Sequence, residues 1–215
     1  MHKLFKNREE AAVQLAILLS KYKNKNALVL ALPSGGVPIG HIIAKELNIP
    51  LDISLCKKTI SPDQEYIPDA LNMEKSILNH STETEFIQFE INRIKESLKK
   101  LYQFFSGDYT PIDLKDKIVI IADDGIVTGN NTISTVRMAK KQGAAEVIVA
   151  APVISPSATN ILKNDADQVI ALTVPRYFMA VSQFYEDFRA VENEEVIRML
   201  FQSKDWPLNR KTFLN

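Results

Sequence analysis

The stretch IVIIADDGIVTGNNT, residues 118–132, carries the clearest indication of the fold. Its first five residues are apolar and mostly β-branched, which predicts a buried strand over 118–122. Two adjacent carboxylates, Asp123 and Asp124, follow this strand, and after a short turn an amphipathic pattern predicts a helix over 131–142. Strand, glycine-containing turn and helix in this order are typical of a parallel α/β sheet, which binds ligands beyond the carboxyl ends of its strands.

A second turn of the same kind, ALPSGGVPIG, occupies residues 31–40. It follows an apolar strand expected over 27–32 and precedes a helix expected over 38–47, with Pro38 at the favoured first helical position. The chain has only 7 glycines in 215 residues, about 3% where about 7% is usual. Five of the seven lie in these two turns. We therefore expect both turns to lie at one rim of the sheet, where backbone must approach a ligand closely.

The remaining pattern predicts a Rossmann-like α/β fold, a parallel sheet with flanking helices, in a single domain over 1–215. Asn7 is a helix cap with Glu10 in the capping-box position. Further strands are expected over 51–56, over 147–151 (ended by Pro152) and over 168–173, and further helices over 157–163 and 193–202. Residues 59–110 are expected to be an insertion. It would comprise an irregular hood over 59–82 and a long helix over 83–105, whose apolar stripe predicts core packing or a homodimer interface.

Composition excludes several classes of protein. The 26 basic and 26 acidic side chains give zero net charge, so no overall field favours nucleic acid or an anionic membrane. The single cysteine, Cys56, cannot form an intrachain disulfide and is expected to be a buried strand residue. The first residues do not resemble a signal peptide and no apolar run reaches 18 residues, so we expect a cytoplasmic protein that binds neither membrane nor nucleic acid.

The residues of the 118–132 stretch suit a sugar phosphate. Carboxylates at a strand end can accept hydrogen bonds from sugar hydroxyls or help to hold a metal-bound ligand. The next helix offers backbone N–H groups and the positive end of its dipole to a phosphate. Thr128, Asn131 and Thr132 add neutral donors.

Residues 119–131, VIIADDGIVTGNN, resemble the phosphoribosyl-pyrophosphate (PRPP) loop of type I phosphoribosyltransferases. The segments LFKNREEAA (4–12), LALPSGGVPIG (30–40), AAPV (150–153) and FMAVSQFYEDF (178–188) are similar to one bacterial branch of predicted phosphoribosyltransferases. The resemblance implies a pentosyltransferase, that is, a glycosyltransferase of nucleotide metabolism. With PRPP and Mg²⁺ it would transfer a phosphoribosyl group to a small-molecule acceptor, usually a base nitrogen, and release pyrophosphate.

The resemblance also implies roles for individual residues. Asp123 and Asp124, the catalytic pair, would bind the ribose hydroxyls, and Mg²⁺ would be held mainly by ligand oxygens and water beside them. The 5′-phosphate would be cradled by Gly125, Ile126, Val127, Thr128, Gly129, Asn130, Asn131 and Thr132. The pyrophosphate loop, often with an unusual peptide geometry, would be Pro33, Ser34, Gly35 and Gly36. Lys57 and Lys58 could add positive charge there; a solvated rim is the alternative for both lysines. Tyr177 and Phe178 would lie on the acceptor side, where an aromatic ring could stack on a base; core packing is the alternative for both.

Some residues depart from the family pattern and keep other functions open. Ser34 stands where the branch commonly has arginine, so a PRPP- or nucleotide-binding regulatory protein without turnover is the main alternative. Val127 stands where transferases of 6-oxopurines carry an acidic residue, which disfavours hypoxanthine and guanine as acceptors. Gly125 replaces a residue that is often apolar. A receiver-like phosphoacceptor domain, in which an aspartate pair helps to bind magnesium, is a third possibility.

Overall fold

The computed structural model describes residues 3–54 and 112–203. The predictions for Cys56, Lys57, Lys58, the hood over 59–82 and the helix over 83–105 lie outside the described residues.

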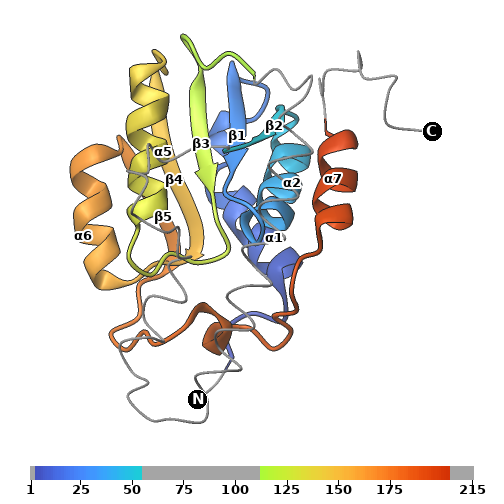
Figure 1. The fold of residues 1–215 in the computed structure, drawn as a ribbon, viewed down its shortest axis with the longest axis vertical. Coiled ribbons are helices and arrows are strands. Elements are labelled where there is room, and N and C mark those ends of the chain that lie inside the picture. The colour runs from blue at the N-terminus through green and yellow to red at the C-terminus, as the bar shows by residue number, and fades with distance from the viewer. Residues whose placement is uncertain (1–2, 55–111, 204–215) are drawn as a thin grey trace, which may run out of the picture.

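A parallel sheet forms the centre of the described structure, with strand order β2-β1-β3-β4-β5 (Figure 1). The apolar runs expected from the sequence form these strands because backbone groups pair along the sheet while both faces are covered. Its strands are β1 (Ala27–Ala31), β2 (Leu51–Ile53), β3 (Ile118–Ala122), β4 (Glu146–Val153) and β5 (Gln168–Thr173). The predicted Rossmann-like α/β fold is confirmed.

Helices cover both faces of the sheet (Figure 1). One face packs against α1 (Arg8–Leu18), α2 (Gly36–Leu47) and α7 (Asn193–Phe201), and the other against α5 (Asn130–Lys141) and α6 (Pro156–Asp165). Successive strand residues alternate between the two cores, so Val29 and Ile120 join the first while Leu28 and Val119 join the second. Short 3₁₀ turns, η1 (Ser20–Tyr22) and η2 (Val181–Phe184), complete the order of elements. None of the helices in the described ranges is long and apolar enough to cross a bilayer.

Several element ends differ from those expected. Helix α2 begins at Gly36, so Pro38 is its third residue, a position whose N–H would have no intrahelical partner. Strand β4 continues through Pro152 to Val153, because its pairing with β3 ends at Ala150 and the missing proline N–H removes no bond between them. Strand β2 ends at Ile53, before residue 56.

The helix cap at Asn7 is formed, with its side chain accepting the Glu10 N–H at 3.0 Å. The Glu10 carboxylate, however, accepts the N–H of Lys6 at 2.6 Å, one residue before the capping-box partner that we expected.

The strand order places both glycine-containing turns together. β1 and β3 are neighbours at the centre of the strand order. The chain leaves β1 toward β2 on one side and leaves β3 toward β4 on the other, and ligands bind in such sheets at the point where the two connections diverge. Ala31 at the end of β1 pairs in register with Ala122 at the end of β3. The turns that follow these two residues therefore start at the same level of the sheet.

Candidate functional site

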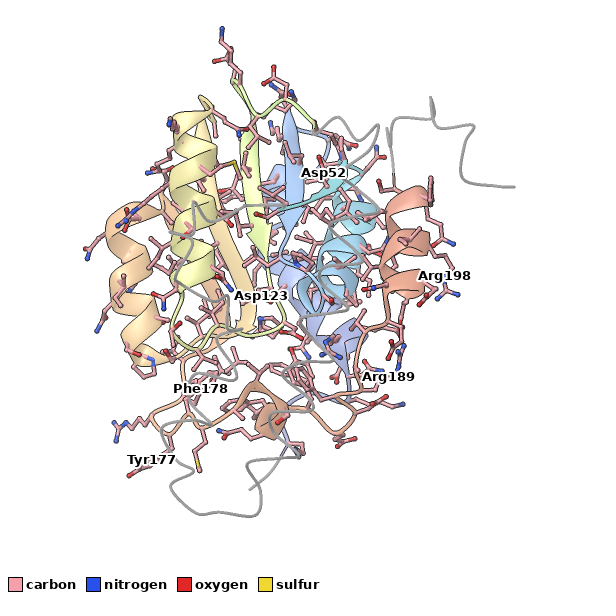
Figure 2. The ribbon with its side chains drawn as sticks, in the orientation of Figure 1. Asp52, Asp123, Tyr177, Phe178, Arg189 and Arg198 are labelled. Carbon is pink, nitrogen blue, oxygen red and sulfur yellow. The ribbon has the colours of Figure 1, made fainter. Side chains whose placement is uncertain are left out.

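The acidic pair at the end of β3 is held in two different ways. Asp123 is half-buried at the carboxyl end of the strand (Figure 2), and one of its carboxylate oxygens accepts the Asp124 N–H at 2.8 Å. Asp124 is 8% exposed, and its Oδ2 lies 2.8 Å from Nε of Arg8, the first residue of α1. Both side chains of this ion pair are about nine-tenths buried (11% and 12% exposed). The structure thus surrounds the two carboxylates differently, although the sequence presents them as equivalent.

The turn after the acidic pair is fixed to the end of β4. The N–H of Ile126 donates to Val153 O at 2.9 Å, and the N–H of Ser155 donates to Ile126 O at 2.9 Å. The Ser155 hydroxyl donates to Val127 O at 2.5 Å and also caps α6. The side chains of Ile126 and Val127 are buried in opposite cores, so these two residues can offer a ligand only their backbone.

The turn leads into the N-terminus of α5, where an anion can bind. Gly129 has φ of 76°, a left-handed conformation that glycine adopts at little cost. The N-cap residue Gly129 has no side chain to cap α5, and the Thr128 hydroxyl accepts the Asn130 N–H only at 3.5 Å. No acidic residue lies in the first turn, so no carboxylate there neutralises the positive end of the helix dipole. Asn130 is exposed, Thr128 and Asn131 are half-buried and Thr132 is buried. The backbone of this helix start and the Thr128 side chain therefore suit a phosphate better than the Thr132 side chain does.

The first glycine turn lies directly against the acidic turn. The Pro33–Ser34 peptide bond is cis, the kind of unusual geometry that the family resemblance implies. A Cβ atom on Gly35 would lie 2.0 Å from Oδ2 of Asp124, and one on Gly36 would lie 2.5 Å from the backbone oxygen of Ala122. Only glycine allows the two turns to approach this closely, so both stretches singled out in the sequence meet at one rim of the sheet.

The glycine at position 125 has a packing explanation. A Cβ there would lie 2.4 Å from Cγ1 of Val181 in η2. Val181 thus occupies the space that a side chain at position 125 would need, which accounts for this departure from the family pattern.

The two aromatic residues assigned to the acceptor side differ in their surroundings. Figure 2 shows Tyr177 and Phe178 beyond the carboxyl ends of the strands. Tyr177 is 80% exposed, whereas Phe178 is half-buried and packs against Phe184 with ring centroids 5.1 Å apart. The contact favours core packing for Phe178 and leaves Tyr177 as the exposed ring.

Three buried side chains around Asp124 and its turn had no role assigned from the sequence. They are Arg8, Tyr185 and Ser155. Arg8 and Tyr185 belong to LFKNREEAA and FMAVSQFYEDF, two segments that carry the family resemblance. The resemblance could have flagged them, but nothing in their local pattern indicates which distant residue each one contacts.

The carboxylates present fit a Mg²⁺ ion that takes most of its ligands from a substrate. Among the residues described, no three His, Cys, Asp or Glu side chains come together as a metal-binding group. Asp123 and Asp124 are adjacent, but the Asp124 carboxylate already pairs with Arg8. Mg²⁺ commonly binds through one or two carboxylates together with waters and substrate phosphates, so this donor set is adequate for it.

The sequence matches one family over most of its length. The sequence model of the phosphoribosyl transferase domain matches residues 3–189, most of the chain, and the chain belongs to this family.

Two curated relatives come from Mycobacterium tuberculosis, in strains CDC 1551 / Oshkosh and ATCC 25618 / H37Rv, and carry the names "Putative phosphoribosyl transferase MT0597" and "Putative phosphoribosyl transferase Rv0571c". Each is 30% identical over 206 residues, which cover 92% of this chain and 46% of the relative. The chain thus spans about half the length of these relatives. The crystal structure of TT1426 from Thermus thermophilus has a TM-score of 0.69 at 28% identity, over 91% of this chain and 97% of that one.

Proposed function

We propose that the chain is a phosphoribosyltransferase that uses PRPP and Mg²⁺ to transfer a phosphoribosyl group to the nitrogen of a base and releases pyrophosphate. The observation that carries this proposal is the contact between the two turns. Gly35 and Gly36 lie against Asp124 and Ala122 so closely that a single Cβ would overlap them. The two turns would then lie close enough to bind two parts of one PRPP molecule, with the pyrophosphate at one turn and the ribose 5-phosphate at the other.

The backbone supports a division of PRPP between the two turns. The 5′-phosphate would bind at the start of α5, where the helix lacks a side-chain cap and an acidic first turn. The ribose hydroxyls would face Asp123 at the end of β3. The pyrophosphate would bind over Ser34 and Gly35, next to the N-terminus of α2, which also lacks a side-chain cap and acidic residues in its first turn.

These residues would act mainly by positioning and by stabilising charge. The C1–oxygen bond to pyrophosphate breaks while the base nitrogen forms its bond to C1, and positive charge develops on the ribose ring. A fixed carboxylate at Asp123 stabilises that charge, and helix N-termini stabilise the departing anion without reorganising during the reaction. Asp123 would help to hold Mg²⁺, which would supply positive charge to neutralise the pyrophosphate oxygens.

Pyrophosphate release tests the proposal directly. The protein would be incubated with PRPP, Mg²⁺ and a panel of purine and pyrimidine bases, and pyrophosphate would be measured enzymatically. We expect release that depends on one base and on Mg²⁺, and that falls sharply in Asp123→Asn. Arg137→Met is the control, because Arg137 forms an exposed ion pair with Asp165 between α5 and α6. A folded protein that releases no pyrophosphate with any base of the panel would contradict an enzymatic role.

A PRPP- or nucleotide-binding protein without turnover is the second candidate. It is favoured by Ser34, which cannot make the bidentate anion contacts of the arginine common at this position. Calorimetry separates the two: PRPP binding with Mg²⁺ and no pyrophosphate release would identify a sensor. Ser34→Arg should then strengthen PRPP binding, and Ser182→Arg, a change in η2, serves as the charge control.

A further inference from the structure

The short strand β2 ends at the same level of the sheet as β1 and β3. Ile53, its last residue, pairs in register with Ala31 of β1, which in turn pairs with Ala122 of β3. The next residue, Ser54, donates its N–H to Ala31 O at 2.9 Å. Ser54 therefore lies against the residue from which the chain enters the turn after β1, although no role was assigned to it from the sequence.

The hydroxyl of Ser54 is connected to the start of α5 through one other side chain. Its Oγ lies 3.0 Å from Oγ1 of Thr135, and Thr135 Oγ1 donates to Asn131 O at 3.0 Å. A carbonyl oxygen can only accept and a hydroxyl has one proton, so Thr135 accepts the proton of Ser54 while it donates its own. A chain of hydrogen bonds thus runs from the end of β2 to the first turn of α5.

Both hydroxyls are buried. Ser54 is 3% exposed and Thr135 is 0% exposed. The core-facing side of α5 is polar toward its N-terminus and apolar farther along: its buried residues are Thr132, Thr135, Val136 and Ala139. Threonine is not a strong helix former, and a buried hydroxyl costs free energy unless it is hydrogen-bonded. The link between Ser54 and Thr135 accounts for two hydroxyls at a place where packing alone favours apolar groups.

The strand that carries Ser54 is restrained on a second side. Asp52 is 1% exposed, and its two carboxylate oxygens accept the N–H groups of Ile53 and Ile112, both at 2.8 Å. Ile112 is 60 positions from Asp52 and belongs to the segment that leads into β3. A strand of only three residues is thereby held by β1 and by this segment, so its end is a fixed support for α5.

We propose that Ser54 and Thr135 are positioning residues that hold the first turn of α5 at the distance from the turn after β1 that one PRPP molecule requires. The proposal rests on the phosphoribosyltransferase function given above, in which these two places bind the 5′-phosphate and the pyrophosphate. Ser54 contacts both: its N–H meets the end of β1, and its hydroxyl acts on α5 through Thr135. Residues 130–132 carry no charge, so the phosphate would depend on backbone N–H groups, whose directions all change when the first turn moves.

Ligands that contain one part of PRPP separate positioning from general stability. Ribose 5-phosphate probes the start of α5, pyrophosphate with Mg²⁺ probes the turn after β1, and PRPP with Mg²⁺ requires both. Calorimetry would compare the wild type with Thr135→Val, Thr135→Ser, Ser54→Ala and the double variant Ser54→Ala/Thr135→Val. Ser134→Ala is the matched control, because the Ser134 hydroxyl makes the equivalent bond to Asn130 O at 2.9 Å but lies outside the buried side of α5.

Thr135→Val keeps the shape of the side chain and removes its hydroxyl. We expect it to weaken the binding of ribose 5-phosphate and PRPP by about 10-fold or more, since a misplacement of ~1 Å can cost about 100-fold. Binding of pyrophosphate should stay close to that of the wild type. Thr135→Ser retains a hydroxyl and should restore most of the affinity for ribose 5-phosphate. The double variant should bind no more weakly than Thr135→Val, because both changes break the same link.

Two results would overturn the inference. One is wild-type affinity for ribose 5-phosphate in Thr135→Val, and the other is an equal loss of ribose 5-phosphate and pyrophosphate binding, which indicates a general structural role. Urea denaturation checks that each variant is folded, and Ser54→Ala decides by the same criteria if Thr135→Val is not. Failure of the wild type to bind PRPP or ribose 5-phosphate would instead contradict the proposed function. The urea cycle of the two single variants and the double variant needs no ligand and would still measure the coupling of Ser54 with Thr135.

Discussion

Replacing Gly35 by alanine should lower the free energy of unfolding, although the backbone conformation of Gly35 is one that alanine adopts. Gly35 has φ −63° and ψ −31°, which any residue adopts, so the change alone would stabilise the protein by about 0.4–1 kcal/mol. The added Cβ, however, would lie 2.0 Å from Oδ2, 2.6 Å from Cγ and 3.0 Å from Oδ1 of Asp124. Ordinary contacts need about 3.5 Å, and Arg8 holds this carboxylate in place. We expect a net loss of about 1–3 kcal/mol of unfolding free energy, as for overpacked cores.

Urea denaturation followed by far-ultraviolet circular dichroism measures this loss. The same change is then made in the background Arg8→Met/Asp124→Ala, where the overlapping carboxylate is absent, and there it should be neutral or stabilising. Gly36→Ala is the comparison, because its Cβ would meet the Ala122 backbone oxygen at 2.5 Å and should be costly in both backgrounds. An equal cost of Gly35→Ala in the two backgrounds would refute the overlap with Asp124 as its cause.

Three further changes test contacts around the site. Gly125→Ala should lower the free energy of unfolding by about 1–3 kcal/mol because the new Cβ overlaps Val181, and Val181→Ala should remove most of that loss. Urea denaturation of the wild type, the two single variants and the double variant measures this coupling. Ser155→Ala should lower the free energy of unfolding by about 1–2 kcal/mol because it removes the α6 cap and the bond to Val127 O. Ser134→Ala, which removes one exposed hydrogen bond within α5, should cost less, and equal midpoints in urea would contradict this. Burial raises the pKa of Tyr185 above its ordinary value of 10.0. The contribution of the protonated Tyr185 hydroxyl to the free energy of unfolding is therefore present in full below pH 10 and falls as the pH rises above 10. Tyr185→Phe should therefore flatten the decline of stability in alkaline solution, and an unchanged pH profile would exclude this origin.

The sheet and the meeting of its two glycine-containing turns could be predicted because their sequence signals are local. Apolar runs over 27–32 and 118–122 indicate strands by themselves, and glycines placed directly after them indicate turns. The rule that parallel strands share one carboxyl edge then brings the two turns together without knowledge of any contact. The register of Ala31 with Ala122 confirms that part of the prediction.

The environment of Asp124 could not be predicted in the same way. Arg8 is 116 positions from Asp124, and a charged residue in the first turn of an amphipathic helix usually faces water. Local rules also misplace element ends where tertiary structure decides them. Pro152 signals the end of a strand, but in β4 its missing N–H costs no bond to β3 because the register with β3 has already ended at Ala150.

The contact between Arg8 and the Arg189 carbonyl has a consequence for the order in which the molecule is assembled. These residues are 181 positions apart, and all five described strands lie between them. During synthesis, the sheet can therefore form before the segment that supports Asp124 has left the ribosome. A nascent chain that stops before Tyr185 contains both glycine-containing turns but leaves Arg8 without Arg189 and Phe188. The environment of Asp124 is thus completed only after all five described strands have been synthesised, when the late segment closes a loop that spans most of the chain.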